Sequence, residues 1–506
     1  MKLDFGTAGI RGIIGDRPDQ LNQAHAARVF DGYAKYLLAT IPNAKNRGVV
    51  IGRDNRRRGA LFTNIAAAIL TGYGIKVYWN NDQMLPTPFI SFLTISKEAA
   101  GAINITASHN PKEYNGIKLY NQHGSQMLPE EITQLKKYFQ TYETYHDYFE
   151  FDQVVANELV HPITAQDFQN YLGQIQALNF QHLDLSKVQL VYSPLHGSGY
   201  DFVKELLTQA KVTAYYPKAE TIEDADFSAI DSPNPETASA FDNSIKLANQ
   251  VGANLILLTD PDADRLGVAV RREADFVLLN GNEMAILICD YLLKYKPRSN
   301  TQTNYLVHSV VSTSLPAMMA QKYQIPTHVC ETGFKWIGKL IQSLNKQSFF
   351  FAFEESYGCL IDERLSRDKD AIQALYLMVI LAAQALAEHT SILDQLDAIY
   401  QQYGYLKTAT LNYNLQSQAQ LDQVKHWFQT LNWTRGGDPD HCNWTPQIRT
   451  QDETLIWQLQ TQTWVALRPS GTEPKYKIYI HVVEATAAAA QTSFDQIVRI
   501  INANKV

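Results

Sequence analysis

Segments with a helical period alternate with short apolar runs over most of the chain, and this alternation constrains the fold more strongly than any other sequence feature. It is typical of α/β domains, in which helices pack against a sheet. In chain order we expect a helix at Ala24–Thr40, a strand at Val49–Gly52, a helix at Gly59–Tyr73, and strands at Lys76–Asn80 and Gly101–Thr106.

The same alternation begins again twice. A second unit starts near Thr164, with strands at Val188–Ser193, Val212–Tyr216 and Leu255–Thr259 and helices at Asp201–Gln209 and Glu236–Gln250. A third unit contains a helix at Asn282–Lys294, strands at Tyr305–Val310, Thr327–Cys330 and Phe349–Phe353, and a long helix at Asp370–His389. We therefore expect three consecutive α/β units.

The C-terminal part has a different pattern. Its predicted strands are Leu406–Leu415, Thr454–Leu459, Trp464–Leu467 and Lys475–Val483, with helices near Leu421–Leu431 and Ala487–Ile501. This order is typical of an α+β domain. Because 506 residues are too many for one hydrophobic core, we predict four domains, at residues 1–163, 164–278, 279–398 and 399–506.

The net charge of −7 argues against a surface that coats nucleic acid, and it means that any anion site must be built locally from Arg and Lys. The four cysteines are far apart and include no C-x-x-C pair, which favours free thiols in a reducing cytoplasm. No apolar run reaches membrane-spanning length, and the N-terminus has no apolar signal region. We expect a cytoplasmic protein without nucleic-acid or membrane partners.

The run Asn104–Leu119 (NITASHNPKEYNGIKL) ends a predicted strand in a turn that presents Ser108 and His109. Its Asn-Pro pair and the Asn-Gly pair at 115–116 favour turns. A nucleophilic serine needs exposure on a rigid turn and a nearby proton acceptor, for which His109 and Lys118 are candidates. The alternative is a surface loop in which Ser108 only caps a turn.

Three carboxylates, Asp260, Asp262 and Asp264, follow a predicted strand in the run TDPDADRLG. Residues two apart on a curved loop can converge on one cation, and all-oxygen ligation suits Mg²⁺. Arg265 adds a positive charge where an anion should bind. The alternatives are a structural Ca²⁺ loop, which usually continues with Gly and Glu, and a solvated acidic turn.

Two further groups of residues have functional groups that suit a sugar phosphate. The run LRPSGTEPKY forms a tight loop whose N–H groups, hydroxyls and guanidinium suit a phosphate: Arg468, Ser470, Gly471 and Thr472. Carboxylate, hydroxyl and ammonium groups that suit sugar hydroxyls follow two other predicted strands: Thr332, Gly333, Lys335, Glu354 and Ser356. Taken singly, an ordinary hairpin and helix caps explain these runs, and Arg367–Asp370, which opens the long helix, also resembles a cap.

Taken together, the motifs resemble the series that defines the α-D-phosphohexomutase superfamily. They are FGTAGIRG (Phe5–Gly12), TASHNPKEYNGIKLY, DPDADRLG, TGFKWIG, FEESYG and RPSGTEP, in the family's order and spread over the whole chain. GRDNRRRG and SPLHGSG (Ser193–Gly199) are most similar to its phosphoglucomutase and phosphopentomutase branch. The chain is shorter than expected for that branch, which puts the sugar preference in question more than the chemistry.

The resemblance implies three related α/β domains with mixed sheets and a C-terminal α+β domain of the TATA-box-binding-protein-like class, arranged around a central cleft. By position, Ser108 matches the phosphoserine, and the three aspartates, with a phosphoserine oxygen, match the ligands of one Mg²⁺. Glu354 and Ser356 match the readers of sugar hydroxyls, and the Arg468–Thr472 loop matches the holder of the non-reacting phosphate. The positions matching proton-transfer or charge-stabilising residues are Arg11, His109, Lys118 and Lys369.

The implied activity is a phosphosugar mutase acting on small sugar phosphates through a bisphosphate, with glucose 1,6-bisphosphate as activator and glucose preferred over mannose. The enzyme alternatives are a phosphopentomutase, a sugar-1,6-bisphosphate synthase and a phosphatase with an aspartate nucleophile. A sugar-phosphate-binding protein without catalysis is the non-enzyme alternative. We expect a monomer or weak oligomer.

Overall fold

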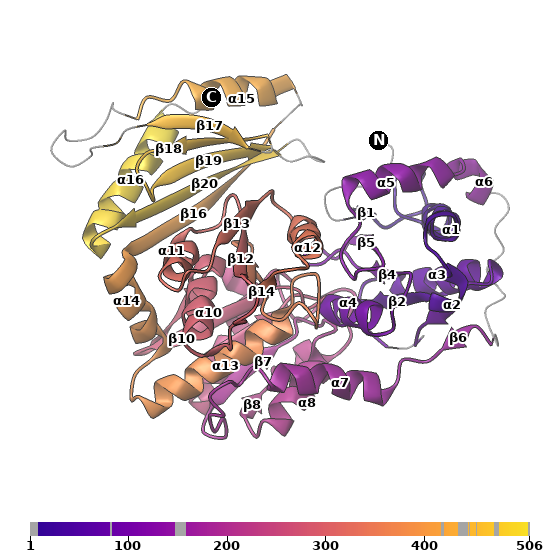
Figure 1. Cartoon of the computed structure of the whole chain (residues 1–506), viewed down its shortest axis with the longest axis horizontal. Helices are drawn as coiled ribbons and strands as arrows, with labels where there is room; N and C mark the ends of the chain where they lie inside the picture. Colours follow the sequence, from indigo (N-terminus) through magenta and orange to yellow (C-terminus); the bar gives the residue numbers. More distant parts are fainter. Residues whose placement is uncertain are drawn as a thin grey trace.

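The computed structural model describes residues 9–80, 83–146, 158–415, 419–433, 444, 446–451, 453–469 and 475–503. These residues form four sheets of six, five, four and five strands. Figure 1 shows the first three sheets with their helices side by side, and the fourth sheet with α15 and α16 as a separate layer that carries the C-terminal end. The prediction of three α/β domains with mixed sheets followed by a fourth, β-rich domain is confirmed.

The first sheet has the order β1-β5-β4-β2-β3-β6. The strands β2, β3, β4 and β6 run parallel, whereas β1 and β5 run antiparallel to their neighbours. The elements are β1 (Ile10–Ile13), α1 (Gln23–Thr40), α2 (Ala44–Arg47), β2 (Val49–Arg53), α3 (Gly59–Gly72), β3 (Val77–Tyr78), α4 (Thr87–Ser96), β4 (Gly101–Ile105), β5 (Tyr114–Tyr120), α5 (Pro129–Leu135), a 3₁₀ turn (Lys136–Tyr138), α6 (Tyr142–His146) and β6 (Val160–His161).

Strand β5 corrects the prediction of a turn at Asn115-Gly116. Both residues lie inside the strand, which pairs with β1 on one side and β4 on the other. A Cβ atom on Gly116 would lie 2.5 Å from the Thr106 carbonyl oxygen and 2.6 Å from that of Ile10. The glycine therefore serves the close approach of three strands rather than a turn.

The second sheet has the order β11-β10-β9-β7-β8. The helix predicted over Glu236–Gln250 is wrong at its start, because a 3₁₀ turn precedes an α-helix that begins only at Asp242. The elements are α7 (Ala165–Gln176), β7 (Gln189–Ser193), α8 (Tyr200–Gln209), β8 (Thr213–Tyr215), 3₁₀ turns (Lys218–Thr221 and Ala238–Phe241), α9 (Asp242–Val251), β9 (Leu255–Thr259), β10 (Leu266–Arg272) and β11 (Asp275–Leu279).

The third sheet has the order β13-β12-β14-β15. Its long helix α13 is buried along most of its length and packs on α7 and on β9 and β10 of the second domain. The elements are α10 (Gly281–Tyr295), β12 (Asn304–Ser309), α11 (Leu315–Gln321), β13 (Thr327–Cys330), α12 (Phe334–Ser343), β14 (Ser348–Glu354), β15 (Gly358–Leu360), α13 (Ala371–Ala387) and α14 (Ile392–Tyr403).

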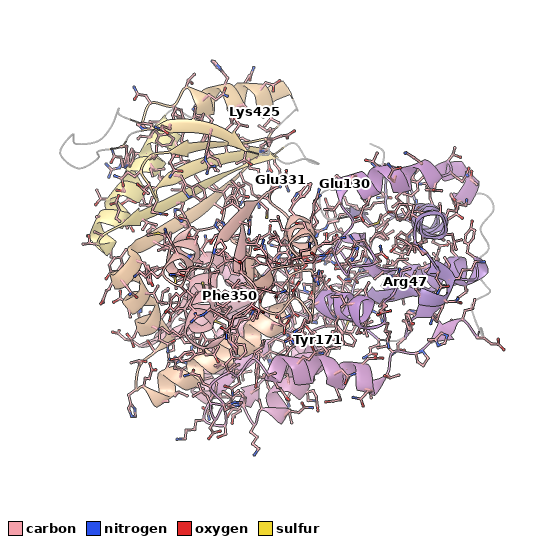
Figure 2. The ribbon with its side chains drawn as sticks, in the orientation of Figure 1. Arg47, Glu130, Tyr171, Glu331, Phe350 and Lys425 are labelled. Atoms are coloured by element: carbon pink, nitrogen blue, oxygen red, sulfur yellow. The ribbon has the colours of Figure 1, made fainter. Side chains whose placement is uncertain are left out.

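The first three domains share one apolar core, which includes Phe89, Phe202 and Leu375 from the three domains in turn. Polar contacts also join them: Lys339 on α12 forms an ion pair with Glu130 on α5 (Nζ to Oε1, 2.8 Å), and Figure 2 labels Glu130 where these domains meet. Among the described helices, none is by itself long and apolar enough to cross a membrane. Only α13 and α14 taken together have that length and composition, and they meet at an angle of 91°.

The fourth sheet is antiparallel throughout, in the order β16-β20-β19-β18-β17, and has its own apolar core. A hydrogen bond between His481 Nε2 and Thr313 Oγ1 (2.8 Å) and a small apolar cluster around Val311 join this domain to the third. The elements are β16 (Tyr405–Asn414), α15 (Ala419–Gln429), β17 (Gln447–Gln451), β18 (Thr454–Gln458), β19 (Trp464–Pro469), β20 (Lys475–Glu484) and α16 (Ala487–Ala503).

Candidate active site

Ser108 lies in the turn between β4 and β5, and it faces the second domain. Its hydroxyl donates a hydrogen bond to Asp260 Oδ2 (2.7 Å) and lies 3.1 Å from His109 Nδ1. The expectation that this serine is exposed is wrong, since only 1% of its surface is accessible. It is covered because the turn is pressed against the loop after β9, where its hydrogen-bond partner lies.

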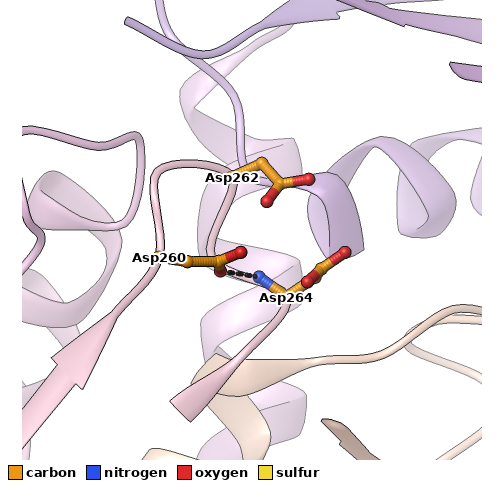
Figure 3. Close-up of side chains that lie close together, drawn as sticks. All are labelled: Asp260, Asp262 and Asp264. Atoms are coloured by element: carbon orange, nitrogen blue, oxygen red, sulfur yellow. Dashed lines mark hydrogen bonds between the residues drawn. The ribbon is translucent and has the colours of Figure 1, made fainter. Parts of the chain in front are cut away.

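The loop between β9 and β10 brings Asp260, Asp262 and Asp264 together. One oxygen from each carboxylate lies within 4.8 Å of the others, and Figure 3 shows all three side chains around a common space. The loop is folded by hydrogen bonds from the backbone N–H groups of Asp264 and Arg265 to Asp260 Oδ1 (3.0 Å each). Ala263, at φ 52°, supplies the left-handed residue that this tight loop requires.

This carboxylate cluster fits a divalent cation. All three side chains are at most 1% exposed, and Asp262 Oδ1 and Asp264 Oδ1 have no hydrogen-bond partner among the described residues. Burying a carboxylate oxygen without a hydrogen-bond partner lowers the stability of the folded protein, and a bound hard cation with oxygen ligands would offset this cost. Burial, followed by repulsion from its two neighbours, raises the pKa of Asp260 well above its ordinary range.

Two lysines from other domains balance part of this negative charge. Lys118 Nζ on β5 lies 2.6 Å from Asp262 Oδ2 and 3.0 Å from Asp264 Oδ2, and Lys369 Nζ lies 3.3 Å from Asp264 Oδ2. Although burial alone opposes a charged amine, the carboxylates raise the pKa of both lysines above their ordinary value. Both amines are therefore protonated at neutral pH and act here as cations.

Three further predicted residues surround Ser108. Arg11 on β1 donates from Nη1 to Asn110 Oδ1 (2.9 Å), and Arg265 Nη1 forms an ion pair with Glu236. Burial, followed by the charges of the two arginines, lowers the pKa of His109 well below its ordinary value, so its imidazole is neutral. The serine turn is thus lined by guanidinium groups and an uncharged histidine, a suitable setting for a phosphate.

The predicted sugar-facing residues meet at the ends of β13 and β14. Glu354 Oε1 accepts a hydrogen bond from the Gly333 N–H (2.6 Å), so the two loops are joined directly. Burial raises the pKa of Glu354 to about 7. Thr332 and Lys335 are buried beside them, and Ser356 is half-buried.

Lys369 connects this region to the carboxylate cluster. Its aliphatic chain passes over Gly358, where an added Cβ would lie 2.1 Å from Lys369 Cδ. The neighbouring Asp370 caps α13, accepting hydrogen bonds from the N–H groups of Ile372 and Gln373 (3.0 Å each). The cap interpretation therefore holds for Asp370, while Lys369 points to the site.

Arg468 lies near the end of β19, opposite Lys477 on β20. Burial lowers the pKa of Lys477, whose charge also interacts with Glu236, Glu355 and Arg265. Sequence reasoning did not single out this lysine, although it directly follows the run LRPSGTEPKY. Ser470, Gly471 and Thr472 lie outside the described residues, as do Phe5–Ala8 of the first motif.

The structure also reveals two supports of the carboxylate loop. Thr87 at the start of α4 donates from its hydroxyl to Asp262 Oδ2 (2.7 Å) and from its N–H to the Asp262 carbonyl (2.8 Å). Ser198 donates from both its N–H (2.8 Å) and its hydroxyl (2.9 Å) to the Pro261 carbonyl. Ser198 belongs to the SPLHGSG run, which was noted only as a resemblance, whereas Thr87 has no signal in the sequence.

Comparison with known proteins shows the family to which the chain belongs. Three successive family models, described as phosphoglucomutase/phosphomannomutase, alpha/beta/alpha domains I, II and III, match residues 2–146, 166–273 and 280–403. The "Phosphoglucomutase" of Staphylococcus epidermidis is 33% identical over 94% of this chain and 90% of its own length. That of a Staphylococcus aureus strain is 32% identical over 99% and 92%. The chain belongs to the phosphoglucomutase/phosphomannomutase family.

Solved structures agree with this family fold. A putative phosphomannomutase from Thermus thermophilus superposes with a TM-score of 0.75 at 20% identity, covering 99% of both chains. The Paramecium phosphoprotein parafusin, named as a phosphoglucomutase, superposes with a TM-score of 0.73 at 18% identity, covering 98% of this chain and 94% of its own. Family membership confirms the resemblance, the four-domain fold and the expected class of enzyme, a phosphosugar mutase acting on small molecules.

Proposed function

We propose that this phosphosugar mutase interconverts glucose 1-phosphate and glucose 6-phosphate, with Ser108 as the phosphoryl carrier and mannose phosphates as poorer substrates. The observation that carries the proposal is the 2.7 Å contact between Ser108 Oγ and the carboxylate cluster, with Lys118 and Lys369 from the first and third domains paired to the same cluster. A serine held at a cation site and surrounded by basic residues is what phosphoryl transfer requires.

Each half-reaction exchanges one P–O bond for another. The bond between phosphorus and Ser108 Oγ breaks, a bond to the free sugar hydroxyl forms, and the hydroxyl proton leaves to a base while the serine oxygen regains a proton. Asp260 Oδ2 and His109 Nδ1 are both within hydrogen-bond distance of Ser108 Oγ. The resulting glucose 1,6-bisphosphate turns over, and its other phosphate returns to Ser108.

The cation we propose is Mg²⁺, one per chain, held by Asp260, Asp262, Asp264 and an oxygen of the phosphorylated Ser108. When bound, it would offset negative charge on the transferring phosphoryl group. The chain's own cations act in the same sense: Arg11 and Arg265 border the serine turn, and their charges are felt at His109. These residues bind and orient the phosphoryl group in a site from which water is largely excluded.

The sugar and its second phosphate are assigned to the third and fourth domains. Glu354 and Ser356 would accept and donate hydrogen bonds with neighbouring ring hydroxyls, beside Thr332, Gly333 and Lys335. The phosphate that does not react would be held by a loop of the fourth domain: Arg468, Ser470, Gly471 and Thr472. We also propose the domain boundaries 163/164, 278/279 and 398/399 and a cytoplasmic monomer or weak oligomer.

A substrate panel tests the proposal. Purified chain with Mg²⁺ and catalytic glucose 1,6-bisphosphate is assayed with glucose, mannose and ribose 1-phosphates, and product 6- or 5-phosphate is measured by a coupled dehydrogenase or by mass spectrometry. We expect kcat/KM to be highest for glucose 1-phosphate, followed by mannose 1-phosphate, because a site that does not read carbon 2 separates these two sugars weakly. A clear preference for ribose 1-phosphate would contradict the proposal and indicate a phosphopentomutase.

A further inference from the structure

Ser108 has an unusual backbone conformation. Its φ of 52° lies in the left-handed region, which costs about 1 kcal/mol or more for a residue with a side chain. The structure around such a residue must hold it in place. The groups that do so come from two segments, Asp54–Arg56 directly after β2 and the turn itself.

The N–H side of Ser108 is held by a short chain of hydrogen bonds. The Ser108 N–H donates to Thr106 Oγ1 (2.8 Å), and the Thr106 hydroxyl donates in turn to Asp54 Oδ2 (2.5 Å). Asp54 Oδ1 accepts from the N–H of Arg56 (3.0 Å). Asp54 and Thr106 are fully buried, so solvent does not compete for these contacts.

The carbonyl side of Ser108 is held by the guanidinium of Arg56. Nη2 donates to the carbonyl oxygens of Ser108 (2.6 Å) and Asn110 (2.5 Å), and Nη1 donates to those of Pro111 and Tyr114 (2.8 Å each). Arg56 Nε also lies 3.3 Å from Asp54 Oδ2, and both side chains are 0% exposed. One side chain therefore donates hydrogen bonds to three carbonyls of the serine turn and to the first carbonyl of β5.

The same segment, together with Arg53 before it, is fastened to the second domain, which carries the carboxylate cluster. Arg53 Nη1 forms an ion pair with Glu223 Oε1 (2.5 Å), Asn55 Nδ2 donates to the Asp224 carbonyl (2.7 Å), and the Arg56 guanidinium lies 5.4 Å from the centre of the Phe227 ring. The segment that holds Ser108 thus also fixes the distance between the two domains at this point.

We propose that Thr106, Asp54 and Arg56 are positioning residues that clamp Ser108 in the left-handed conformation from which its hydroxyl faces the Asp260 carboxylate. This inference rests on the proposed function, because it assigns the clamp to phosphoryl transfer at Ser108. It gives GRDNRRRG, which the mechanism above does not use, a role in the reaction.

Thr106 offers the sharpest test, because one pair of variants separates the hydroxyl from the side-chain shape. Thr106→Val removes the hydroxyl and should lower kcat roughly a hundredfold, as expected for a misplaced reacting group. The KM for glucose 1-phosphate and the affinity for Mg²⁺, measured by calorimetry on unphosphorylated chain, should stay unchanged. Thr106→Ser keeps the hydroxyl and should retain most of the wild-type kcat.

Arg56→Lys provides a second test, since it keeps the charge but loses the planar fork of donors. It should show the same fall in kcat and a slower phosphorylation of Ser108 by glucose 1,6-bisphosphate, followed by intact-protein mass spectrometry. The matched control is Arg57→Gln, whose side chain is 59% exposed and pairs with Asp226 at the surface. It should behave like wild type.

A Thr106→Val or Arg56→Lys variant with wild-type kcat would overturn the clamp. The clamp would also be overturned if Thr106→Ser lost as much kcat as Thr106→Val. The proposed function fails separately, if wild-type chain shows neither mutase turnover nor phosphate on Ser108.

Discussion

The phosphoryl-transfer region and the sugar-facing region differ in what holds their polar groups. In the first, a hydroxyl and lysines from other domains contact Asp262 and Asp264, and Ser108 donates to the Asp260 carboxylate of the second domain. Ser108 and the three aspartates are each at most 1% exposed. In the second, Glu354 accepts one backbone hydrogen bond, and the Thr332 hydroxyl has no hydrogen-bond partner among the described residues.

This difference matches the two tasks that a mutase combines. The phosphoryl carrier has to stay at one point, and contacts made within the protein fix it before any ligand arrives. The sugar has to bind in two orientations, so its partners keep polar atoms available and form their hydrogen bonds with the ligand.

The largest effect is expected at Lys118, which compensates two buried carboxylates. Lys118→Met should abolish measurable mutase activity and, in the presence of chelator, lower the free energy of unfolding by about 3–5 kcal/mol. The reason is that Asp262 loses its buried lysine, while Asp264 keeps only the longer contact with Lys369. The control is Lys294→Met, which breaks an exposed ion pair with Asp290 and should cost under about 1 kcal/mol. Denaturant titration of both variants measures this, and equal small losses would contradict the charge balance described above.

Asp262→Asn should have the next largest effect. Removing one of three carboxylate charges should weaken Mg²⁺ binding by at least roughly tenfold, and calorimetry on the unphosphorylated chain measures it. Chelation should abolish turnover of wild-type chain, and Mg²⁺ should restore it. Full activity of chelated enzyme would refute a cation role for this loop.

Glu354 should give the sugar-facing region a pH dependence of its own. Because burial raises its pKa from an ordinary 4.5 to about 7, the folded state binds the extra proton, and stability should fall as pH rises from about 4.5 to about 7. Glu354→Gln should therefore gain Tm relative to wild type at pH 8 but not at pH 4. An unchanged Tm difference across this range would show that Glu354 ionises normally.

The same variant tests ligand binding. The ionised carboxylate accepts hydrogen bonds from two sugar hydroxyls better than the protonated acid does. The ratio of wild-type to Glu354→Gln kcat/KM for glucose 1-phosphate should therefore rise between pH 6 and pH 8. Taking the ratio removes the ionisation of the substrate phosphate, which affects both enzymes equally.

Ser198→Ala should show the smallest effect. It removes one of two hydrogen bonds to the Pro261 carbonyl and leaves the other, from the backbone N–H. We expect a loss of about 1 kcal/mol, seen as a several-fold weaker Mg²⁺ affinity with little change in Tm. A loss as large as that of Asp262→Asn would mean that the loop depends on this support far more than its remaining contacts suggest.

Much of the fold could be predicted, since apolar periodicity located the helices α1, α3 and α13 and the buried strands β2, β4 and β9 within a few residues. Strand β5 could not, because Asn115 and Gly116 have local preferences for turns, and only the pairing with β1 and β4 overrides them. The helix α4 was missed although it is buried almost throughout. Because the residues Thr87–Thr94 are all buried, this helix has no polar face and so no helical period in the sequence.

Among the site residues, those in compact motifs could be found, because Ser108 and the three aspartates carry their chemistry in adjacent positions. Thr87 and Arg56 could not be recognised as parts of the site, because their roles depend on contacts with residues 52 or more positions away in the sequence. The burial of Ser108 also lay beyond sequence reasoning, which treats a turn as exposed.

A labelling experiment tests most directly whether Ser108 carries the phosphoryl group. Unphosphorylated chain is incubated with Mg²⁺ and glucose 1,6-bisphosphate labelled in its phosphates, and the label is located by peptide mapping in wild type and in Ser108→Ala. We expect an acid-stable phosphoserine at Ser108 in wild type and no label in the variant. A hydroxylamine-labile label on Asp260, or a label that Ser108→Ala retains, would contradict this expectation.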